Sequence, residues 1–234
     1  MSCRIVAEIL ALLKEKVVPG VCTLELEELA VKETKKRKAV PAFKGYAGFP
    51  YALCCSPNDR IIHGMPNDVP LQEGDILSID FGVLYDEFYG DAAITLPVGS
   101  ISREASHLMA KTEESLLKGI EQAAAGNRLF DISYAVQAHV EASGYSVVRD
   151  FVGHGIGKKL HEDPQVPNYG KAGRGIQLKV GMVLAIEPMV NSGTYAVKVL
   201  EDGWTAVTAD GSLSAHFEHT VAITKQGPDI LTRL

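Results

Sequence analysis

The sequence predicts an α+β fold built from two similar halves around one composite sheet. Two observations lead to it: the order helix, helix, strands occurs twice along the chain, and the strand segments alternate apolar and polar residues between turn signals. The half-repeats span roughly residues 1–98 and 101–224. We expect them to form a single domain over residues 1–234, with no extension domain ahead of it.

Four helices are predicted from apolar residues at helical spacing and from helix-end signals. Thr23, Ser102 and Asp131 have the side chains of N-caps and are expected to open the second, third and fourth helix. Pro19–Gly20 and Gly144 end the first and the fourth. The predicted helices span about residues 3–17, 23–37, 102–125 and 131–144.

Strands are predicted where β-branched and aromatic residues alternate with polar ones. In the first half one strand ends near His63, and GDILSIDFGVLYDEFYGDAAITL forms a hairpin that turns near Tyr85–Glu87. The run Phe151–Gly170, FVGHGIGKKLHEDPQVPNYG, is expected to lack regular structure because Gly and Pro are frequent in it. Strands of the second half are expected near residues 145–152, 182–187, 196–209 and 216–224.

Composition indicates a globular protein of the cytoplasm. Apolar residues make up 46% of the 234 residues, enough for a core, and a net charge of -6 argues against wrapping nucleic acid. Arg4, Glu8 and Lys14 interrupt the apolar start, which predicts an amphipathic helix rather than a signal peptide or membrane span. The cysteines lack metal-finger spacing, and adjacent Cys54 and Cys55 suit no structural disulfide, as expected in a reducing compartment.

Four carboxylates lie inside or at the end of apolar strands. Asp80 in SIDFG and Asp91 in YGDAA come opposite or nearly opposite each other in the predicted hairpin, where like charges repel. Glu187 ends the apolar strand VLAIE, and Glu218 in LSAHFEHTVAI shares a strand face with His216. A carboxylate buried in such a place is costly unless it is paired or binds a metal. The four residues therefore predict a shared cation site.

Charge and donor type indicate two divalent metal ions at that site. Four carboxylates carry four negative charges, which one divalent cation would only half neutralise and two would balance. His154 adds a nitrogen donor, a set that suits Mn, Fe, Co or Zn, and Gly153 and Gly155 beside it are expected to leave space for metal and substrate. Paired metals lower the pKa of a bridging water and polarise a carbonyl group, so the predicted reaction is hydrolysis.

Six motifs occur in this order along the chain: NDRIIHGMPND, SIDFG, YGDAA, GHGIG with HEDPQVPNYG, LAIEPM and DGSLSAHFEHT. In these motifs the chain resembles type I methionine aminopeptidases of the pita-bread fold. The resemblance covers nearly the whole chain from about Arg4. It implies two pseudo-symmetric half-domains with helices packed on a curved, mostly antiparallel sheet. It also implies removal of the initiator methionine from peptides and nascent proteins with a small second residue, by attack of a metal-bridging water or hydroxide. The order and spacing of the six motifs are those of the family.

Metal and catalytic roles follow from the resemblance, residue by residue. Asp91 and Glu218 would bridge the two metals, and Glu187 would be both a ligand and the general base. His63 and His161 would be catalytic and contact the substrate without binding metal. The implied metal ligands are Asp80, Asp91, His154, Glu187 and Glu218.

The substrate pocket is expected in the loop AVPAFKGYAGFPYALCC, whose aromatic residues follow no helical or strand period and suit an apolar slot for methionine. Two positions depart from the family: Phe43 stands where many relatives have cysteine, and Leu160 where many have phenylalanine, which leaves the shape of the slot open. The lining residues implied by the resemblance are Tyr46, Phe49, Cys54, His63, Leu160 and Trp204.

The remaining histidines are expected to be structural. His107 and His139 lie in predicted helices without partners, and His216 and His219 flank Glu218, where they could support it.

Other functions share some of these features. An X-Pro aminopeptidase or prolidase has the same fold and metal set, but typically has EPG where this chain has EPM, and an extra N-terminal domain. A catalytically inactive binding relative usually loses ligands, and all five are present here. A glycosidase with two carboxylates is disfavoured by the histidines and the number of acids.

The expected partners are the N-termini of peptides and nascent chains, with no specific nucleic acid and no membrane. The basic run Lys35–Lys38 could contact the ribosome transiently, although a solvated helix end is the favoured interpretation. We expect a monomer.

Overall fold

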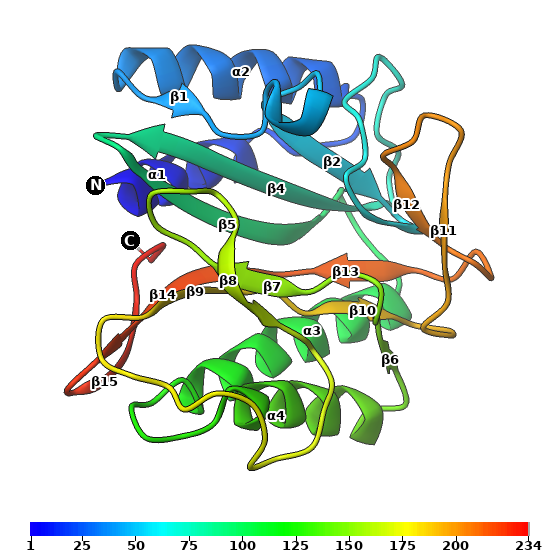
Figure 1. Cartoon of the computed structure of the whole chain (residues 1–234). Coiled ribbons are helices and arrows are strands. Elements are labelled where there is room, and N and C mark those ends of the chain that lie inside the picture. The colour runs from blue at the N-terminus through cyan, green and yellow to red at the C-terminus, as the bar shows by residue number, and fades with distance from the viewer. Residues whose placement is uncertain (234) are drawn as a thin grey trace.

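The computed structural model describes residues 1–233, which contain four α-helices and a single 3₁₀ turn (Figure 1). The helical elements are α1 (Ser2–Lys14), α2 (Thr23–Lys36), η1 (Tyr46–Gly48), α3 (Arg103–Glu121) and α4 (Leu129–Ala142). The strands are β1 (Val40–Pro41), β2 (Leu53–Pro57), β3 (Arg60–Ile62), β4 (Ile76–Tyr85), β5 (Phe88–Pro97), β6 (Ser146–Val147), β7 (Gly153–Gly155), β8 (Glu162–Val166), β9 (Val183–Ile186), β10 (Met189–Asn191), β11 (Val197–Val199), β12 (Ala206–Thr208), β13 (Ser214–His216), β14 (His219–Thr224) and β15 (Gly227–Ile230).

The first half packs α1 and α2 against a sheet in which β4 pairs with β1, β2 and β5, all antiparallel. The β4–β5 hairpin confirms the predicted pair. Its turn lies at Asp86 and Glu87, whose φ angles of 49° and 64° are left-handed, as the twist of a tight hairpin requires. Ile9, Leu13 and Phe81 are among the buried side chains of this half.

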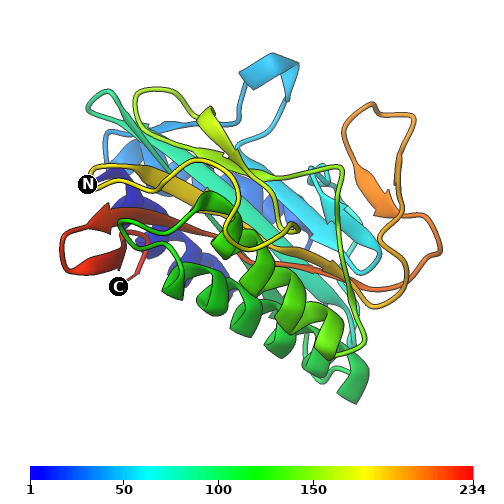
Figure 2. The ribbon, with the colours of Figure 1, turned by 60° about the horizontal axis from the view of Figure 1, so that its bottom comes forward.

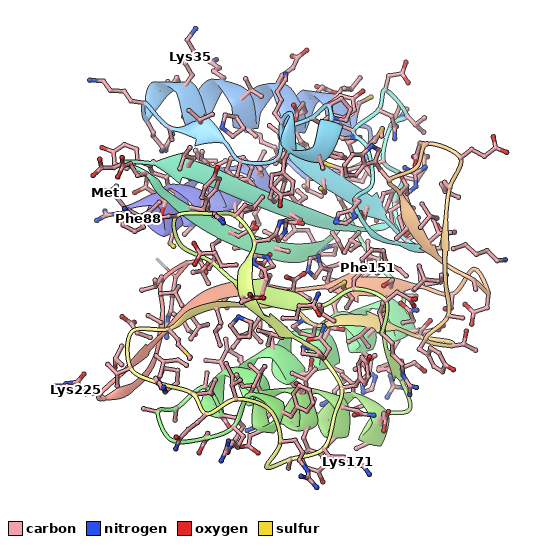
Figure 3. The ribbon with its side chains drawn as sticks, in the orientation of Figure 1. Met1, Lys35, Phe88, Phe151, Lys171 and Lys225 are labelled. Atoms are coloured by element: carbon pink, nitrogen blue, oxygen red, sulfur yellow. The ribbon has the colours of Figure 1, made fainter. Side chains whose placement is uncertain are left out.

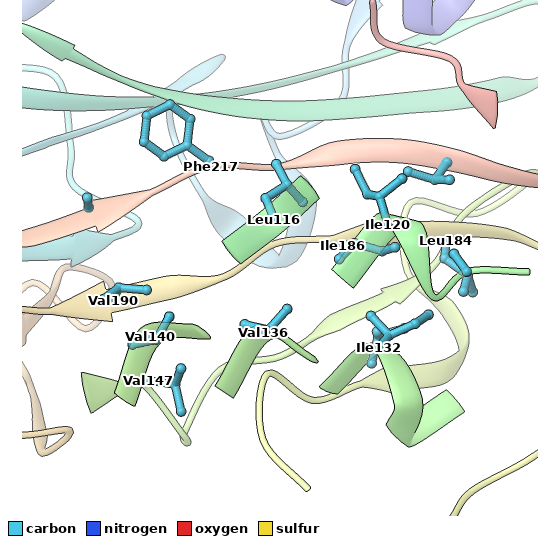
Figure 4. Close-up of a cluster of buried hydrophobic side chains, with 14 of the residues drawn as sticks. Leu116, Ile120, Ile132, Val136, Val140, Val147, Leu184, Ile186, Val190 and Phe217 are labelled. Atoms are coloured by element: carbon cyan, nitrogen blue, oxygen red, sulfur yellow. The ribbon is translucent and has the colours of Figure 1, made fainter. Parts of the chain in front are cut away.

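In the second half α3 and α4 lie side by side (Figure 2). Helix α3 packs against strands β9, β10 and β13, and α4 packs against β6 and β8. The five-stranded sheet of this half has the order β15-β14-β9-β7-β8, and each pair of neighbouring strands is antiparallel. Side chains from both helices meet the strands in one apolar cluster (Figure 4). The cluster includes Leu116, Ile120, Ile132, Val136, Val140, Leu184, Ile186, Val190 and Phe217.

The two halves meet where β5 runs beside β13 and β14. Ala93 and Glu218 exchange backbone hydrogen bonds, with N···O distances of 3.4 Å and 2.9 Å. The Thr95 hydroxyl donates to His216 O at 2.8 Å and accepts from His216 N at 2.9 Å. The sheets of the two halves therefore continue into each other beside Glu218, and the predicted α+β architecture is confirmed.

Some sequence predictions were wrong in detail. The run Phe151–Gly170 contains the strands β7 and β8, because its glycines fit between neighbouring strands instead of breaking them. The strand expected at 145–152 is limited to β6. Thr23 and Asp131 are not N-caps: Thr23 is the first residue of α2, and Asp131 lies inside α4, where Oδ2 accepts from Arg128 N at 2.7 Å. Ser102 does cap α3.

None of the helices in residues 1–233 has the length and hydropathy that a membrane crossing requires. In the same part of the chain, all four cysteines are free thiols.

Candidate active site

A cavity of about 310 Å³ lies between the two halves. Residues from both halves line it, as expected from the way β5 adjoins β13 and β14. It brings together every metal-ligand candidate and every pocket candidate of the sequence analysis. These are Asp80, Asp91, His154, Glu187, Glu218, His63, His161, Tyr46, Phe49, Cys54, Leu160 and Trp204.

Asp80 and Asp91 come from the two strands of the hairpin. Asp80 pairs with Ala93 and Asp91 with Gly82, so the two carboxylates are diagonal neighbours on one face of the hairpin, as the alternation predicted. Gly82 is needed here: a Cβ at this position would lie 2.9 Å from the Phe43 ring and 3.1 Å from Asp91 Oδ1. The glycine therefore leaves the carboxylate room to face the cavity.

The second half supplies the other donors. Glu187 directly follows β9, and Glu218 lies in the break between β13 and β14. One ligand atom each of Asp91, His154 and Glu218 lies within 4.8 Å of the other two. Glu187 adjoins this group, with Oε1 at 3.5 Å from His154 Nε2. Atoms at these separations can share a bound cation.

His154 is oriented by its own strand. Its Nδ1–H donates to the carbonyl of Gly155 at 2.9 Å, so the lone pair is on Nε2, the nitrogen nearest Glu187. Burial lowers the pKa of His154 to about 4, which keeps the ring neutral as a metal ligand must be. A Cβ at Gly153 or Gly155 would collide with the carbonyl oxygens of Ala185 or Asp163. These glycines therefore make room for neighbouring strands, which corrects the expectation that they make room for metal and substrate.

The carboxylates are buried without enough protein partners. Asp80 Oδ1, Asp91 Oδ1 and Glu218 Oε1 have no hydrogen-bond partner within residues 1–233. Burial raises the pKa of Asp80 to about 7, and burial together with neighbouring carboxylates raises those of Asp91, Glu187 and Glu218 well above their ordinary value. Buried acids in contact, with unpaired oxygens, need a cation or protons to be stable. The donor set fits bound divalent metal.

His63 and His161 face the same cavity from opposite halves. His63 has a left-handed φ of 57°, and its ring meets Phe151 edge-on at 5.5 Å. Burial lowers the pKa of His63 to about 4, so it is a neutral hydrogen-bonding group. His161 Nδ1 lies 2.7 Å from the Tyr46 hydroxyl, and its ring centroid lies 4.3 Å from that of His154. Both imidazoles can therefore reach a group bound beside the carboxylates.

An apolar slot forms the other wall of the cavity. Phe43, Phe49, Cys54 and Leu160 are each less than a tenth exposed and pack in one cluster with Trp204. Phe49 and Trp204 meet edge-to-face at 5.2 Å. Burial raises the pKa of the Cys54 thiol well above its ordinary value, so it contributes as a neutral, polarizable group. The slot suits an uncharged, flexible side chain next to the metal donors.

Comparison with known proteins decides the family. The model of metallopeptidase family M24 matches residues 1–225. The chain belongs to this family. Among curated members, it is 60% identical to the methionine aminopeptidase of Clostridium perfringens over 229 residues, 98% of this chain and 92% of that one. It is 52% identical to methionine aminopeptidase 1 of Bacillus subtilis, over 99% of this chain and 93% of the relative.

Solved structures agree with the fold. The crystal structure of methionine aminopeptidase from Thermotoga maritima matches with a TM-score of 0.98 and 48% identity, covering 100% of this chain and 94% of that one. Prolidase from Pyrococcus furiosus matches with a TM-score of 0.79 at 23% identity and with 62% of its chain covered, which shows the fold alone. The chain is thus a type I methionine aminopeptidase relative with the pita-bread fold, as the resemblance implied.

Some residues that line the cavity were not predicted from the sequence. Phe151, Asp150 and Val152 directly precede the β7 glycine and histidine, and Phe151 lies at the junction of the two halves (Figure 3). The available signal was their position directly before Gly153 and His154 in RDFVGH. Ala47 and Ile62 also line the cavity, and as small or apolar residues they carried no signal.

The four remaining histidines are not among the residues that line the cavity, but two have partners that the sequence did not show. His107 Nδ1 lies 2.7 Å from the Tyr145 hydroxyl, and His139 pairs with Glu114 at 3.0 Å, which corrects the expectation that these two are unpartnered. His216 is 1% exposed, with Nε2 at 3.7 Å from Glu187 Oε2. His219 Nδ1 lies 2.9 Å from the Thr232 hydroxyl.

Proposed function

We propose that this protein is a metal-dependent aminopeptidase that removes the N-terminal methionine from peptides and nascent proteins whose second residue is small. One observation carries the proposal: a single cavity holds the five candidate metal donors, His63 and His161, and an apolar slot. Relatives of 52% and 60% identity over nearly the whole chain are named methionine aminopeptidases, which supports the same assignment.

The metal requirement belongs to the family, and the number and identity of the ions are part of the proposal. Two divalent cations, drawn from Co, Mn, Fe and Zn, would balance the four carboxylate charges. Asp91 and Glu218 would be ligands of both ions, as the family resemblance implies, and one donor atom of each lies within 4.8 Å of the other and of His154. The remaining ligands would be Asp80, His154 and Glu187. Such a pair of ions polarises a carbonyl group and makes water a nucleophile at neutral pH.

The protein's own groups would bind the peptide and move the proton. Glu187 is the proposed general base. Its carboxylate lies between the imidazoles of His154 and His216 and can take a proton from the attacking water. His63 and His161 are the proposed hydrogen-bond partners of the peptide bond. A neutral imidazole N–H there stabilises the negative charge that develops on the carbonyl oxygen.

The apolar slot would select methionine. Its walls are aromatic and aliphatic side chains, and the edge-to-face pair of Phe49 and Trp204 closes one side. An unbranched thioether fits such a slot and gains sulfur contacts with the aromatic rings. Phe43 and Leu160 both line the slot, so the two departures from common family residues change its shape directly.

The remaining parts of the proposal concern assembly and place of action. We propose that residues 1–234 form one catalytic domain that works as a monomer in the cytoplasm, with a transient ribosome contact near Lys35–Lys38. Arg37 is already paired with Glu8 and Glu33, so exposed Lys35 and Lys38 would supply that contact. Sedimentation of the purified protein with and without ribosomes tests the monomeric state and the ribosome contact.

Metal titration tests the enzyme class. Protein stripped with a chelator should release no methionine from Met-Ala-Ser, and stepwise addition of Mn²⁺ or Co²⁺ should restore release. Full activity in the chelated protein would reject a metal-dependent mechanism. No release at any metal concentration, with the protein folded, would reject the aminopeptidase assignment.

A further inference from the structure

Tyr46 contacts the imidazole of His161 across the junction of the two halves. The Tyr46 hydroxyl lies 2.7 Å from His161 Nδ1, and the ring centroids are 5.0 Å apart at an angle of 59°. The two residues are 115 positions apart in the sequence. Tyr46 therefore does more than line the slot: it holds one nitrogen of a histidine that faces the metal donors.

The loop that carries Tyr46 is built to keep its position. Gly45 N donates to Phe49 O at 2.7 Å, and Tyr46 N donates to Phe43 O at 2.9 Å. Gly45 and Ala47 both have left-handed φ angles, of 87° and 48°, which turn the chain tightly on either side of Tyr46. Phe49 is 3% exposed and anchors the far end of the turn.

The contact decides which nitrogen of His161 meets the substrate. Since Nδ1 is occupied by the Tyr46 hydroxyl, Nε2 is the nitrogen left to contact a bound peptide. A neutral imidazole carries its single proton on one nitrogen or the other. A phenol O–H that donates to Nδ1 leaves the proton on Nε2, and Nε2–H is the group that can donate to a carbonyl oxygen as it becomes negative.

We infer that Tyr46 is a positioning residue for His161: its O–H donates to Nδ1 and holds the ring in the tautomer whose Nε2–H faces the peptide. This inference rests on the proposed function for its kinetic consequence, but the tautomer itself does not depend on activity. The hydroxyl has no other hydrogen-bond partner among the described residues, so it is free to take this role.

Tyr46→Phe removes only the hydroxyl and keeps the ring as a wall of the slot. Losing a group that orients a ligand or catalytic imidazole typically costs about 10- to 100-fold, which we expect in kcat for Met-Ala-Ser. KM should change by less than about twofold, because the apolar contact with methionine is kept. Tyr51→Phe is the matched control: Tyr51 packs in the same cluster, its ring meets Phe49 edge-on, and within residues 1–233 its hydroxyl has no hydrogen bond to another side chain.

The tautomer is measured by two-bond ¹H–¹⁵N correlation spectra of ¹⁵N-histidine-labelled, Zn²⁺-loaded protein, with His161 assigned by the missing signal of His161→Gln. The wild-type protein and Tyr51→Phe should show Nε2–H, and Tyr46→Phe should show Nδ1–H or a mixture. Nδ1–H in the wild type, or unchanged Nε2–H in Tyr46→Phe, would overturn the inference. So would a Tyr46→Phe variant that raises KM and leaves kcat intact, since Tyr46 would then be a wall of the slot only. If the wild type releases no methionine, the proposed function fails while the spectra still decide the tautomer.

Discussion

Thr220 in the second half binds the backbone of Asp91 in the first half twice. Its hydroxyl donates to Asp91 O at 2.7 Å and accepts from Asp91 N at 3.2 Å. Thr220 is fully buried, so these bonds are shielded from water. This contact joins the two sheets at the residue proposed to bridge both metals.

Thr220→Val should therefore weaken both the fold and the metal site. Two buried backbone groups of Asp91 lose their partner, which costs about 1–3 kcal/mol of unfolding free energy. Urea unfolding of the metal-free protein and calorimetric metal titration measure the two effects. Thr220→Ser keeps the hydroxyl and should behave like the wild type. Equal midpoints and equal metal affinities for Thr220→Val and the wild type would contradict the role of this contact.

Asp91→Ala should abolish metal binding at both positions, because Asp91 is proposed to bridge them. Elemental analysis of the dialysed protein measures the metal content. Asp210→Ala is the control: this carboxylate is held by Thr194 and Ser212 in an exposed turn, outside the donor cluster, and its loss should leave the metals bound. Two tightly bound metals in Asp91→Ala would show that the ligand assignment is wrong.

Removing the metal should make stability fall with rising pH. The raised pKa of Asp80, about 7, and the raised pKa values of Asp91, Glu187 and Glu218 mean that the folded metal-free protein holds protons which the unfolded chain has already released. The free energy of unfolding then decreases as pH rises from about 4, where the carboxyls of the unfolded chain lose their protons, through the folded-state pKa values, which for Asp80 is about 7. Bound cations replace those protons, so the loaded protein should show a smaller decrease.

Urea unfolding at pH 7 and pH 9, with and without chelator, checks this. These two pH values sample the upper part of that range, above the pH at which the buried histidines titrate; their lowered pKa values act with the opposite sign at lower pH. A metal-free protein whose free energy of unfolding rises from pH 7 to pH 9 would contradict the raised pKa values of the four acids.

His161→Ala should separate catalysis from metal binding. Its side chain contacts the cavity but is not among the proposed ligands, so metal content should stay at the wild-type level. Loss of a hydrogen-bonding imidazole at the peptide bond should lower kcat by about 100- to 10,000-fold. His107→Ala, on the surface of α3, should retain wild-type turnover. A His161→Ala variant that loses metal would place His161 among the ligands.

Much of the fold followed from local signals. The apolar spacing of the helices, the capping hydroxyl of Ser102 and the turn at Asp86–Glu87 are features of neighbouring residues, and the structure confirms them. The strands β7 and β8 escaped prediction because the glycines of β7 are explained only by the carbonyls of Ala185 in β9 and Asp163 in β8, which lie against them in the folded sheet.

The candidate site was predictable because it uses charged residues in apolar strands. Burial of Asp80, Asp91 and Glu218 is expensive, so their presence in strands indicated a common partner. The Thr220 contact with Asp91 and the Tyr46 contact with His161 could not be predicted, since each joins residues more than a hundred positions apart. Ordinary threonines and tyrosines give no sign of such roles in a single sequence.

A competition assay tests the central claim most directly. The metal-loaded protein is mixed with equal amounts of Met-Ala-Ser, Met-Lys-Ser and an X-Pro peptide, and the products are followed by mass spectrometry. We expect methionine to be released from Met-Ala-Ser, with little release from Met-Lys-Ser and none of X from X-Pro. Release of X from the X-Pro peptide, with Met-Ala-Ser left intact, would contradict the assignment.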